Sequence, residues 1–451
     1  MPSETNSGGF YLMKRRQEKT IQIIIGVLAL IMVVLRFLLN EKGRVNPDSI
    51  RFLRFAKVLP EIDNTTTPLG YPAAIKFFSW FGMHEFWASK AVGIAALIFI
   101  LLFAWKKKFY LRETVVTAAL FSFVSIFSYT MSEALILPAV FVFLYVARNV
   151  ILQAYPKIQT VLFLTLSLII LYNIRYSALF FIGACFLFGL WKFRKNYGKT
   201  FMVSAVLSGL FVIAYKFLFI DYYNPDYVQT FLEFGVYPTS KLLPEFFQGI
   251  FTSFNPFIHI ADPAGGIINY GIYGIGFLNV VLIILLLSRS HLSESEQFFI
   301  FTGITGILCS YFIQYVYAVN PLDYRLLAPF ILSVWLVYFR KLFSVFGKFT
   351  YGVSLLSLLT GFAFTWMTKA DYLENRQEMK DYLITEQLLE KPVLFYIKDQ
   401  ESYEIQTAEL ASTVNPLLEV TFNPKDSLKT NCLTEHKVLQ RLKVQTNEYQ
   451  K

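Results

Sequence analysis

Charged residues are scarce in this chain of 451 residues. Aspartate, glutamate, lysine and arginine together make up 16% of it, whereas 55% is hydrophobic and 18% is aromatic. A soluble chain of this length needs more polar surface than that. A polytopic membrane protein does not, because its lipid-facing side chains are also apolar. The shortage of charge therefore excludes an ordinary soluble protein and predicts an integral membrane protein.

Cysteine is also rare, and the usual metal-binding patterns are missing. Cys185 and Cys309 fall in apolar runs, and Cys432 stands alone in a polar tail. These positions exclude a disulfide framework and a zinc motif of spaced cysteines. The sequence "HIAD" offers His259 and Asp262, but two candidate ligands are too few for a metal site. We expect no metal ligands among the site residues.

Apolar runs long enough to cross a bilayer recur along the chain. Such runs form helices, because a backbone in lipid must satisfy its own hydrogen bonds. A crossing takes about 20 residues, and the sequence predicts about eleven transmembrane helices in an all-α polytopic protein. The predicted spans are 21–39, 89–105, 113–129, 132–147, 158–173, 176–191, 200–219, 267–288, 298–317, 326–340 and 349–368. Because the first run can span and follows a basic segment, we expect an uncleaved helix and no signal peptide.

The net charge of +10 comes mostly from short loops between these runs. The clusters "MKRRQEK", "WKKKFYLRE", "WKFRKNYGK" and "FRKLFSVFGK" all fall on one predicted side, which favours membrane topology over a nucleic-acid partner. We therefore expect a cytoplasmic N-terminus, and the odd number of predicted spans then places the C-terminus on the non-cytoplasmic side. The first external loop departs from this one-sided distribution of cations, because it carries Arg44, Arg51, Arg54, Lys57 and Lys76. These cations are candidates for a function there.

Three regions follow from this pattern. Residues 1–20 form a cytoplasmic tail, and residues 21–370 form the transmembrane domain with large external loops at 40–88 and 220–266. Residues 371–451 are polar, with strands expected at "KPVLFYIKD" and "LLEVTFN" and a helix near 374–390. This predicts a small extracytoplasmic α/β domain. We find no internal repeat and no low-complexity tract.

The first external loop predicts two helices that lie in the membrane interface. Pro47 suits the first turn of a helix, and Asp48 suits the positive end of its dipole. In the residues that follow, apolar side chains share one face of the predicted helix, and Arg51 and Arg54 lie on the other. A second apolar segment follows the turn "PLGYP" and ends near Trp80. Together the two helices would roof a groove at the outer leaflet.

Charged residues also stand at the outer ends of later spans. In "SYTMSEALILP", Ser132 is expected to cap a helix and Glu133 lies in its first turn. Arg175 lies between two spans in "LYNIRYSALFF", and "NPLDYRLLAPF" places Asp323 and Arg325 at the start of another. Each has a structural explanation, as a helix-dipole partner or an interface anchor. Their shared position on one face instead suggests a substrate site.

The order of these motifs resembles the GT-C superfamily of integral-membrane glycosyltransferases, above all the bacterial relatives of protein mannosyltransferases and aminoarabinose transferases. The resemblance covers about residues 20–370: an external Asp after the first span, a loop ending in "PLGYP", "SE" opening a span, then "RY" and "DYRLLAPF". Many members carry an Asp-Glu pair in the first loop. Here Ser49 follows Asp48, which leaves a second carboxylate role to Glu133.

The resemblance implies a bacterial inner or plasma membrane as the location, and it implies a reaction and a set of roles. The donor would be a sugar on a polyprenyl phosphate, and the acceptor a glycan, a lipid or a protein. Asp48 would be the general base, a role typically worth about 10²–10⁴ in rate. Arg325, Arg175 and either Arg51 or Arg54 would bind the lipid phosphate, since arginine binds phosphate through paired hydrogen bonds. Glu133 and Asp323 would complete the substrate site. No cofactor is required, and dependence on a divalent metal stays open.

Two other functions fit a polytopic chain. An O-antigen polymerase or ligase relies on arginines in a large late external loop, but residues 220–266 hold one lysine and no arginine. A transporter or flippase for a lipid-linked sugar usually has ionisable residues at mid-membrane and related halves with broken helices. In this sequence the charges gather at span ends, which favours the glycosyltransferase.

Overall fold

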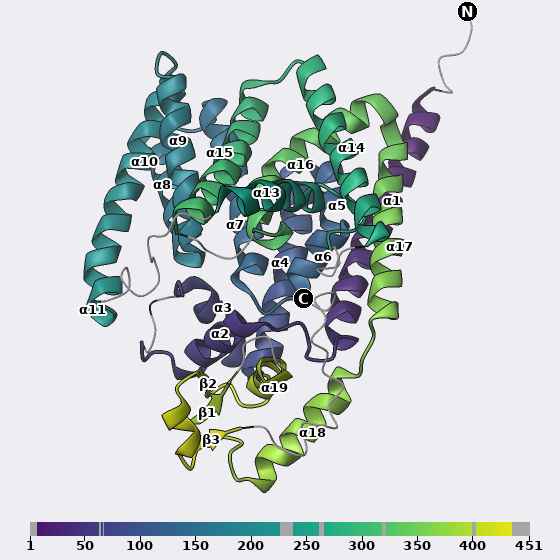
Figure 1. Ribbon diagram of the computed structural model, residues 1–451. Helices are drawn as coiled ribbons and strands as arrows, with labels where there is room; N and C mark the ends of the chain where they lie inside the picture. Colours follow the sequence, from purple (N-terminus) through teal and green to yellow (C-terminus); the bar gives the residue numbers. More distant parts are fainter. Residues whose placement is uncertain are drawn as a thin grey trace, which may run out of the picture.

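Long apolar helices make up most of the chain, as its composition predicts. The computed structural model describes residues 7–62, 65, 67–225, 238–260, 266–317, 322–398 and 403–434 (Figure 1). The helices that run along the bundle are α1 (Ser7–Leu38), α4 (Glu85–Lys107), α5 (Leu111–Ala118), α6 (Phe121–Ser128), α7 (Ser132–Ile151), α8 (Lys157–Ile174), α9 (Leu179–Trp191), α10 (Asn196–Tyr215), α14 (Ile267–Arg289), α15 (Glu294–Tyr317), α16 (Tyr324–Phe346) and α17 (Tyr351–Met367).

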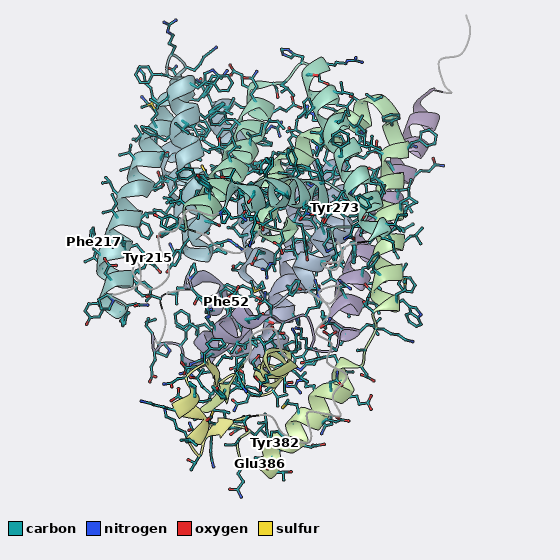
Figure 2. The ribbon with its side chains drawn as sticks, viewed as in Figure 1. Phe52, Tyr215, Phe217, Tyr273, Tyr382 and Glu386 are labelled. Atoms are coloured by element: carbon teal, nitrogen blue, oxygen red, sulfur yellow. The ribbon has the colours of Figure 1, made fainter. Side chains whose placement is uncertain are left out.

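The bundle has the length and surface of a membrane domain. Within the described ranges, eight helical stretches are long and apolar enough to cross a membrane, or nine if the bent pair α5–α6 is one span. Large apolar side chains face outward, such as Phe217 beyond the end of α10, which is 63% exposed (Figure 2). Such a surface is stable against lipid and unfavourable in water. The protein is therefore an integral membrane protein.

The expected total of eleven spans stays a prediction. Two features explain why a count of helices by length and hydropathy gives fewer spans than eleven. Residues Tyr176–Trp191 form a shorter apolar helix, and Tyr324–Met367 counts as a single stretch. Within that stretch, the short helix η3 (Gly347–Thr350) joins α16 to α17.

One predicted span is broken in the middle. Helices α5 and α6, which replace the straight helix expected at 113–129, meet at an angle of 71°. The break frees backbone groups that a continuous helix would satisfy. The amide of Phe121 regains a partner by donating to the Ser357 hydroxyl at 2.8 Å. A side chain of α17 therefore stabilises the bend.

The two ends of the bundle differ. At the lower end in Figure 1 lie α2 (Pro47–Val58), α3 (Gly70–Ser79) and the C-terminal elements, and we call it the Asp48 end. Helix α1 begins at the opposite end, which we call the N-terminal end. Helix α13 (Thr239–Ser253) lies across the bundle in this view. Short helical segments follow α8 and α10: η1 (Tyr176–Ala178), η2 (Lys216–Ile220) and α11 (Asp221–Tyr223).

Helix α2 begins where the sequence predicts. Asn46 accepts a hydrogen bond from the Ser49 amide at 3.1 Å, and the Ser49 hydroxyl accepts one from the Asn46 amide at 3.0 Å. Pro47 occupies the first turn, where its missing N–H costs nothing. This reciprocal cap fixes the direction in which the chain enters α2.

Both apolar sides of α2 contact protein. Phe52 packs edge to face on Tyr71 of α3, with ring centroids 5.0 Å apart (Figure 2). Ile50 and Leu53 join the core of the C-terminal elements instead. The sequence predicts a helix lying on the membrane surface. The apolar residues of α2 instead cover two sides, one packed on α3 and the other on the C-terminal elements. The exposed aromatics are at the end of α3, where Trp80 is 74% exposed.

The C-terminal elements have the predicted α/β character. Helix α18 (Tyr372–Thr385) precedes a parallel sheet in the order β2-β1-β3, formed by β1 (Val393–Tyr396), β2 (Leu418–Thr421) and β3 (Cys432–Leu433). Helix α19 (Tyr403–Ser412) links β1 to β2, and η4 (Pro424–Leu428) follows. The buried Lys42 of the first loop pairs with Glu409 of α19. These elements therefore pack against the first loop; their independence as a domain stays a prediction.

Candidate functional site

A buried carboxylate holds two arginines at the Asp48 end of the bundle. The Oε1 atom of Glu133 lies 2.8 Å from Nη1 of Arg175 and 3.4 Å from Nε of Arg325. The Glu133 side chain is fully buried, and the two arginines are 17% and 18% exposed. Glu133 thus supplies one negative charge to two guanidinium groups. The structure therefore brings into contact three residues that the sequence places at the outer ends of different spans.

Helix ends place each of these side chains. Glu133 is the second residue of α7, Arg175 is the residue that ends α8, and Arg325 is the second residue of α16. The expected cap at Ser132 is wrong, because the N-cap position belongs to Met131, which makes no side-chain cap. The Ser132 hydroxyl is instead 3.3 Å from Oε2 of Glu133, to which it donates. As the first helical residue, Ser132 lies one position past the N-cap, from which a side chain accepts the amides of the first turn.

Asp323 acts as the cap of α16. Its carboxylate accepts a hydrogen bond from the Leu326 amide at 3.0 Å and lies 3.8 Å from Nε of Arg325. The carboxylate is 45% exposed. Asp323 therefore fixes the start of α16 and, with Glu133, flanks Arg325.

Asp48 stands in the first turn of α2, as predicted, and is 49% exposed. Its charge is among those acting on the Arg325 guanidinium, together with Asp323 and Glu133. The nearest cation partner on its own helix is Arg51, whose Nη2 is 3.9 Å away. Asp48 is thus an accessible carboxylate beside a cationic site.

Arg51 lies on α2, beside Asp48. It lines a cavity of about 280 Å³ between α2 and β2, together with Arg54, Glu419 and Phe422. Arg54 is already engaged there, donating to the Leu417 carbonyl at 3.1 Å and lying 3.4 Å from Glu419. A role for Arg51 in binding the lipid phosphate stays a prediction.

Arg44 is a member of the cluster whose role the sequence does not specify. Its guanidinium lies 3.7 Å from the ring centroid of Tyr129, and the Arg325 guanidinium lies 5.9 Å from the same ring. Arg44 is fully buried. Its carbonyl accepts from Nζ of the buried Lys90 at 3.2 Å. In the sequence, Arg44 was marked by its place in the first external loop, which carries more cations than the other predicted external loops.

A buried arginine, Arg36, and a buried histidine, His259, lie near Arg44. Arg36 of α1 is buried, with one hydrogen bond to Thr365 at 3.5 Å, and the charge of Arg44 acts on it. Buried His259 packs against Tyr324 with the two rings tilted by 52° and their centroids 3.9 Å apart. Burial lowers the pKa of His259, and the charges of Arg36 and Arg44 lower it further, so the ring is neutral at neutral pH. The neighbourhood disfavours any additional cation.

Burial raises the pKa of two groups beside the cluster, Tyr71 and Glu41. Burial and the charge of Glu133 raise the pKa of Tyr71 above its ordinary value, so its hydroxyl stays protonated. Burial raises the pKa of Glu41 in the first loop to about 7. Its Oε2 accepts from the Asn40 amide group at 3.0 Å.

In the part of the chain that the structure describes, no three His, Cys, Asp or Glu side chains gather as a metal site. Asp262, the partner considered for His259, lies outside the described residues. Comparisons with protein families, with curated proteins and with solved structures find no match. The interpretation of the cluster therefore depends on its own geometry and charge.

Proposed function

We propose that this protein is a glycosyltransferase of the GT-C type, which moves a sugar from a polyprenyl-phosphate donor to an acceptor hydroxyl. One observation carries the proposal. Arg175 and Arg325 converge on a single buried oxygen of Glu133, at the end of the bundle where Asp48 is accessible. Two arginines gathered at one site suit a phosphate, and an exposed carboxylate beside them suits a base.

In the proposed reaction, Asp48 accepts the proton of the acceptor hydroxyl as that oxygen attacks the anomeric carbon of the donor. The bond between the anomeric carbon and the phosphate oxygen breaks, and its electron pair leaves with the polyprenyl phosphate. Arg325 and Arg175 stabilise the negative charge that develops on this leaving group. Glu133 does not contact the substrate; it orients both guanidinium groups. No step requires a cofactor.

The surroundings of the cluster support a lipid-borne donor. The site lies at the ends of membrane helices, level with the first loop, where a polyprenyl phosphate head group would be found. The exposed Phe77, Trp80 and Phe81 at the end of α3 offer apolar contacts for a lipid chain. The cavity between α2 and β2, which Arg51 lines, is a place for the acceptor.

We also propose that the Asp48 end faces away from the cytoplasm, since the loops at the opposite end carry the cationic clusters. A reporter fused after Lys451 should then report the non-cytoplasmic side. A cytoplasmic signal would contradict both this orientation and the odd number of spans.

The function is tested by incubating purified, reconstituted protein with a panel of polyprenyl-phosphate sugars and an acceptor mixture extracted from the cell envelope. Mass spectrometry follows each donor. We expect one donor to be consumed, with release of free polyprenyl phosphate. If none of them is consumed while the protein stays folded, the proposal fails.

The broken helix α5–α6 favours a second candidate, a transporter for a lipid-linked sugar. Helices interrupted within the bilayer are typical of transporters, and the 71° bend lies within a predicted span. In vesicles carrying a fluorescent polyprenyl-phosphate sugar, a transporter would move the label between leaflets and leave the donor intact. A transferase would cleave it.

A further inference from the structure

A cationic cavity opens at the N-terminal end of the bundle, far along the helices from Glu133. It has a volume of about 510 Å³, within the range of small-ligand sites. Five cations and two carboxylates line it, which leaves a formal excess of three positive charges. The cations are Lys19, Lys108, Arg112, Arg148 and Arg340, and the carboxylates are Glu18 and Glu113.

Helices from distant parts of the chain build this cavity. Lys19 comes from α1, Lys108 follows α4, Arg112 belongs to α5, Arg148 to α7 and Arg340 to α16. No local sequence pattern therefore accounts for the gathering of these charges. Trp105 and Tyr110 add aromatic surface to the wall.

The cations of the cavity are only partly neutralised. Arg112 pairs with Glu18 at 2.8 Å. Among the described residues, no carboxylate oxygen lies within 4.0 Å of the charged nitrogens of Lys19, Lys108 or Arg148. Arg148 is half-buried, and its guanidinium lies 5.7 Å from the ring centroid of Phe109. A half-buried arginine without a carboxylate partner gains most from an anionic ligand.

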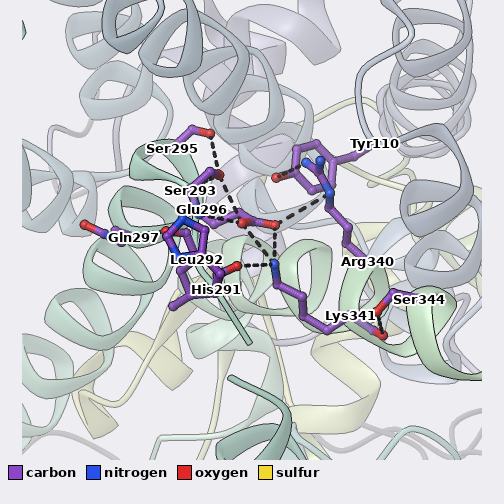
Figure 3. A network of polar contacts seen from close by, with 10 residues as sticks. All are labelled: Tyr110, His291, Leu292, Ser293, Ser295, Glu296, Gln297, Arg340, Lys341 and Ser344. Carbon is purple, nitrogen blue, oxygen red and sulfur yellow. Dashed lines mark hydrogen bonds and ion pairs between the residues drawn. The ribbon is translucent and has the colours of Figure 1, made fainter. Parts of the chain in front are cut away.

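The neighbouring network holds one wall in place. Figure 3 shows Arg340 turned toward Tyr110, whose hydroxyl lies 3.2 Å from its Nη1, and toward Glu296, whose Oε1 lies 3.6 Å from its Nε. Glu296 is itself fixed by Lys341 at 3.0 Å and by the Ser293 amide at 2.8 Å. Arg340 still keeps 51% of its side chain exposed. Its guanidinium group is therefore held in one orientation and can still donate a hydrogen bond to a ligand in the cavity.

The loop at the cavity also carries backbone strain. Lys108 and Tyr110 both have left-handed backbones, with φ of 50° and 48°. Non-glycine residues avoid this conformation unless the surrounding structure imposes it, and such residues concentrate at functional sites. The strained turn places Lys108 and Tyr110 on the same cavity wall.

We infer that this cavity binds a phosphate-bearing anion, separately from the site at Glu133. Arginine and lysine at the ends of membrane helices, with tryptophan and tyrosine between them, match the depth and chemistry of a phospholipid head group. A soluble phosphate or diphosphate offers the same chemistry. Because the cavity lies at the other end of the bundle, this inference does not depend on the proposed transferase activity.

The test compares a cavity variant with a matched control. Arg148→Gln with Lys108→Asn removes two cavity charges, and asparagine tolerates the left-handed backbone at position 108. The control, Lys106→Gln with Lys157→Gln, removes two exposed cations that do not line the cavity. Elution profile and unfolding temperature verify folding. If the double variant misfolds, Arg148→Gln alone takes its place, and Arg148→Lys should retain binding.

Two probes separate the sources of phosphate. Detergent-solubilised protein is titrated with short-chain phosphatidylglycerol against phosphatidylcholine by native mass spectrometry, and with sodium pyrophosphate by calorimetry. We expect the cavity variant to bind the anionic probe at least about tenfold more weakly than the wild type and the control. Loss confined to phosphatidylglycerol supports a lipid head group, and loss confined to pyrophosphate supports a soluble anion. Equal binding by variant and control, or no binding of either probe by the wild type, would overturn the inference.

Discussion

Glu133 and Arg175 form a buried ion pair in which Oε1 of the carboxylate lies 2.8 Å from Nη1 of the guanidinium. The same oxygen faces Arg325, so one negative charge serves two cations. Taking this carboxylate away would leave two guanidinium groups close together in a buried site. The pair therefore sets both the stability of this end of the bundle and the direction in which the arginines point.

Glu133→Gln should destabilise the protein strongly. Removing one partner of a buried ion pair typically costs about 3–5 kcal/mol, since the remaining charge stays desolvated. The unfolding temperature in detergent measures the loss. Glu294→Gln is the control, because the Glu294–Lys195 pair is exposed and 3.7 Å long. An exposed pair is worth about 0–1 kcal/mol. Equal losses in the two variants would contradict the structural role of Glu133.

Asp48→Asn should abolish sugar transfer and leave folding intact. The amide cannot accept the proton from the acceptor hydroxyl, and loss of a general base typically lowers the rate by about 10²–10⁴. The measurement is release of polyprenyl phosphate by reconstituted protein. Glu61→Gln, at another exposed carboxylate of the first loop, should transfer at the wild-type rate. Full transfer by the Asp48 variant would remove Asp48 from the mechanism.

Arg325→Ala should weaken donor binding. Loss of a charge-assisted hydrogen bond to phosphate costs about 1.5–3 kcal/mol, or about tenfold to a hundredfold in affinity. Titration of the donor against purified protein measures it. Arg325→Lys keeps the charge but loses the two-pronged geometry, so an intermediate affinity is expected. The exposed Arg289 at the other end of the bundle provides the control, Arg289→Ala. An unchanged donor titration for Arg325→Ala would argue against phosphate binding.

Glu41→Gln should stabilise the protein in a pH-dependent way. Burial raises the folded-state pKa of Glu41 from 4.5 to about 7. Between these values the folded state binds more protons than the unfolded state, so stability falls as the pH rises through this window. Glutamine keeps a neutral side chain at every pH and avoids that loss.

The gain from Glu41→Gln should therefore be absent near pH 4.5 and reach on the order of 1–3 kcal/mol above pH 7. Unfolding temperatures of wild type and variant across this range measure it. Glu386→Gln, at an exposed position near the end of α18, should show no such trend. A gain that is the same at every pH would mean that Glu41 is not protonated on folding.

Local sequence was enough to predict several parts of this structure. The apolar runs fall on helices of the bundle, and Asn46, Pro47 and Ser49 start α2 where the turn chemistry indicates. Both sets of features depend on neighbours in the chain. The one-sided distribution of charge also selected Glu133, Arg175 and Arg325 as a group, because residues at the same ends of helices share a face.

The contacts between those residues were not predictable, because they join segments far apart in the chain. The sequence could not show that Arg51, which it assigned to the site, also lines a cavity between α2 and β2. It could not show that Arg44, Lys42 and Lys90 are buried, because a buried cation depends on partners supplied by distant elements. Sequence alone thus determined a membrane bundle and gathered Glu133, Arg175 and Arg325 at one end of it. Tertiary structure decided that one carboxylate, Glu133, would be shared by two arginines.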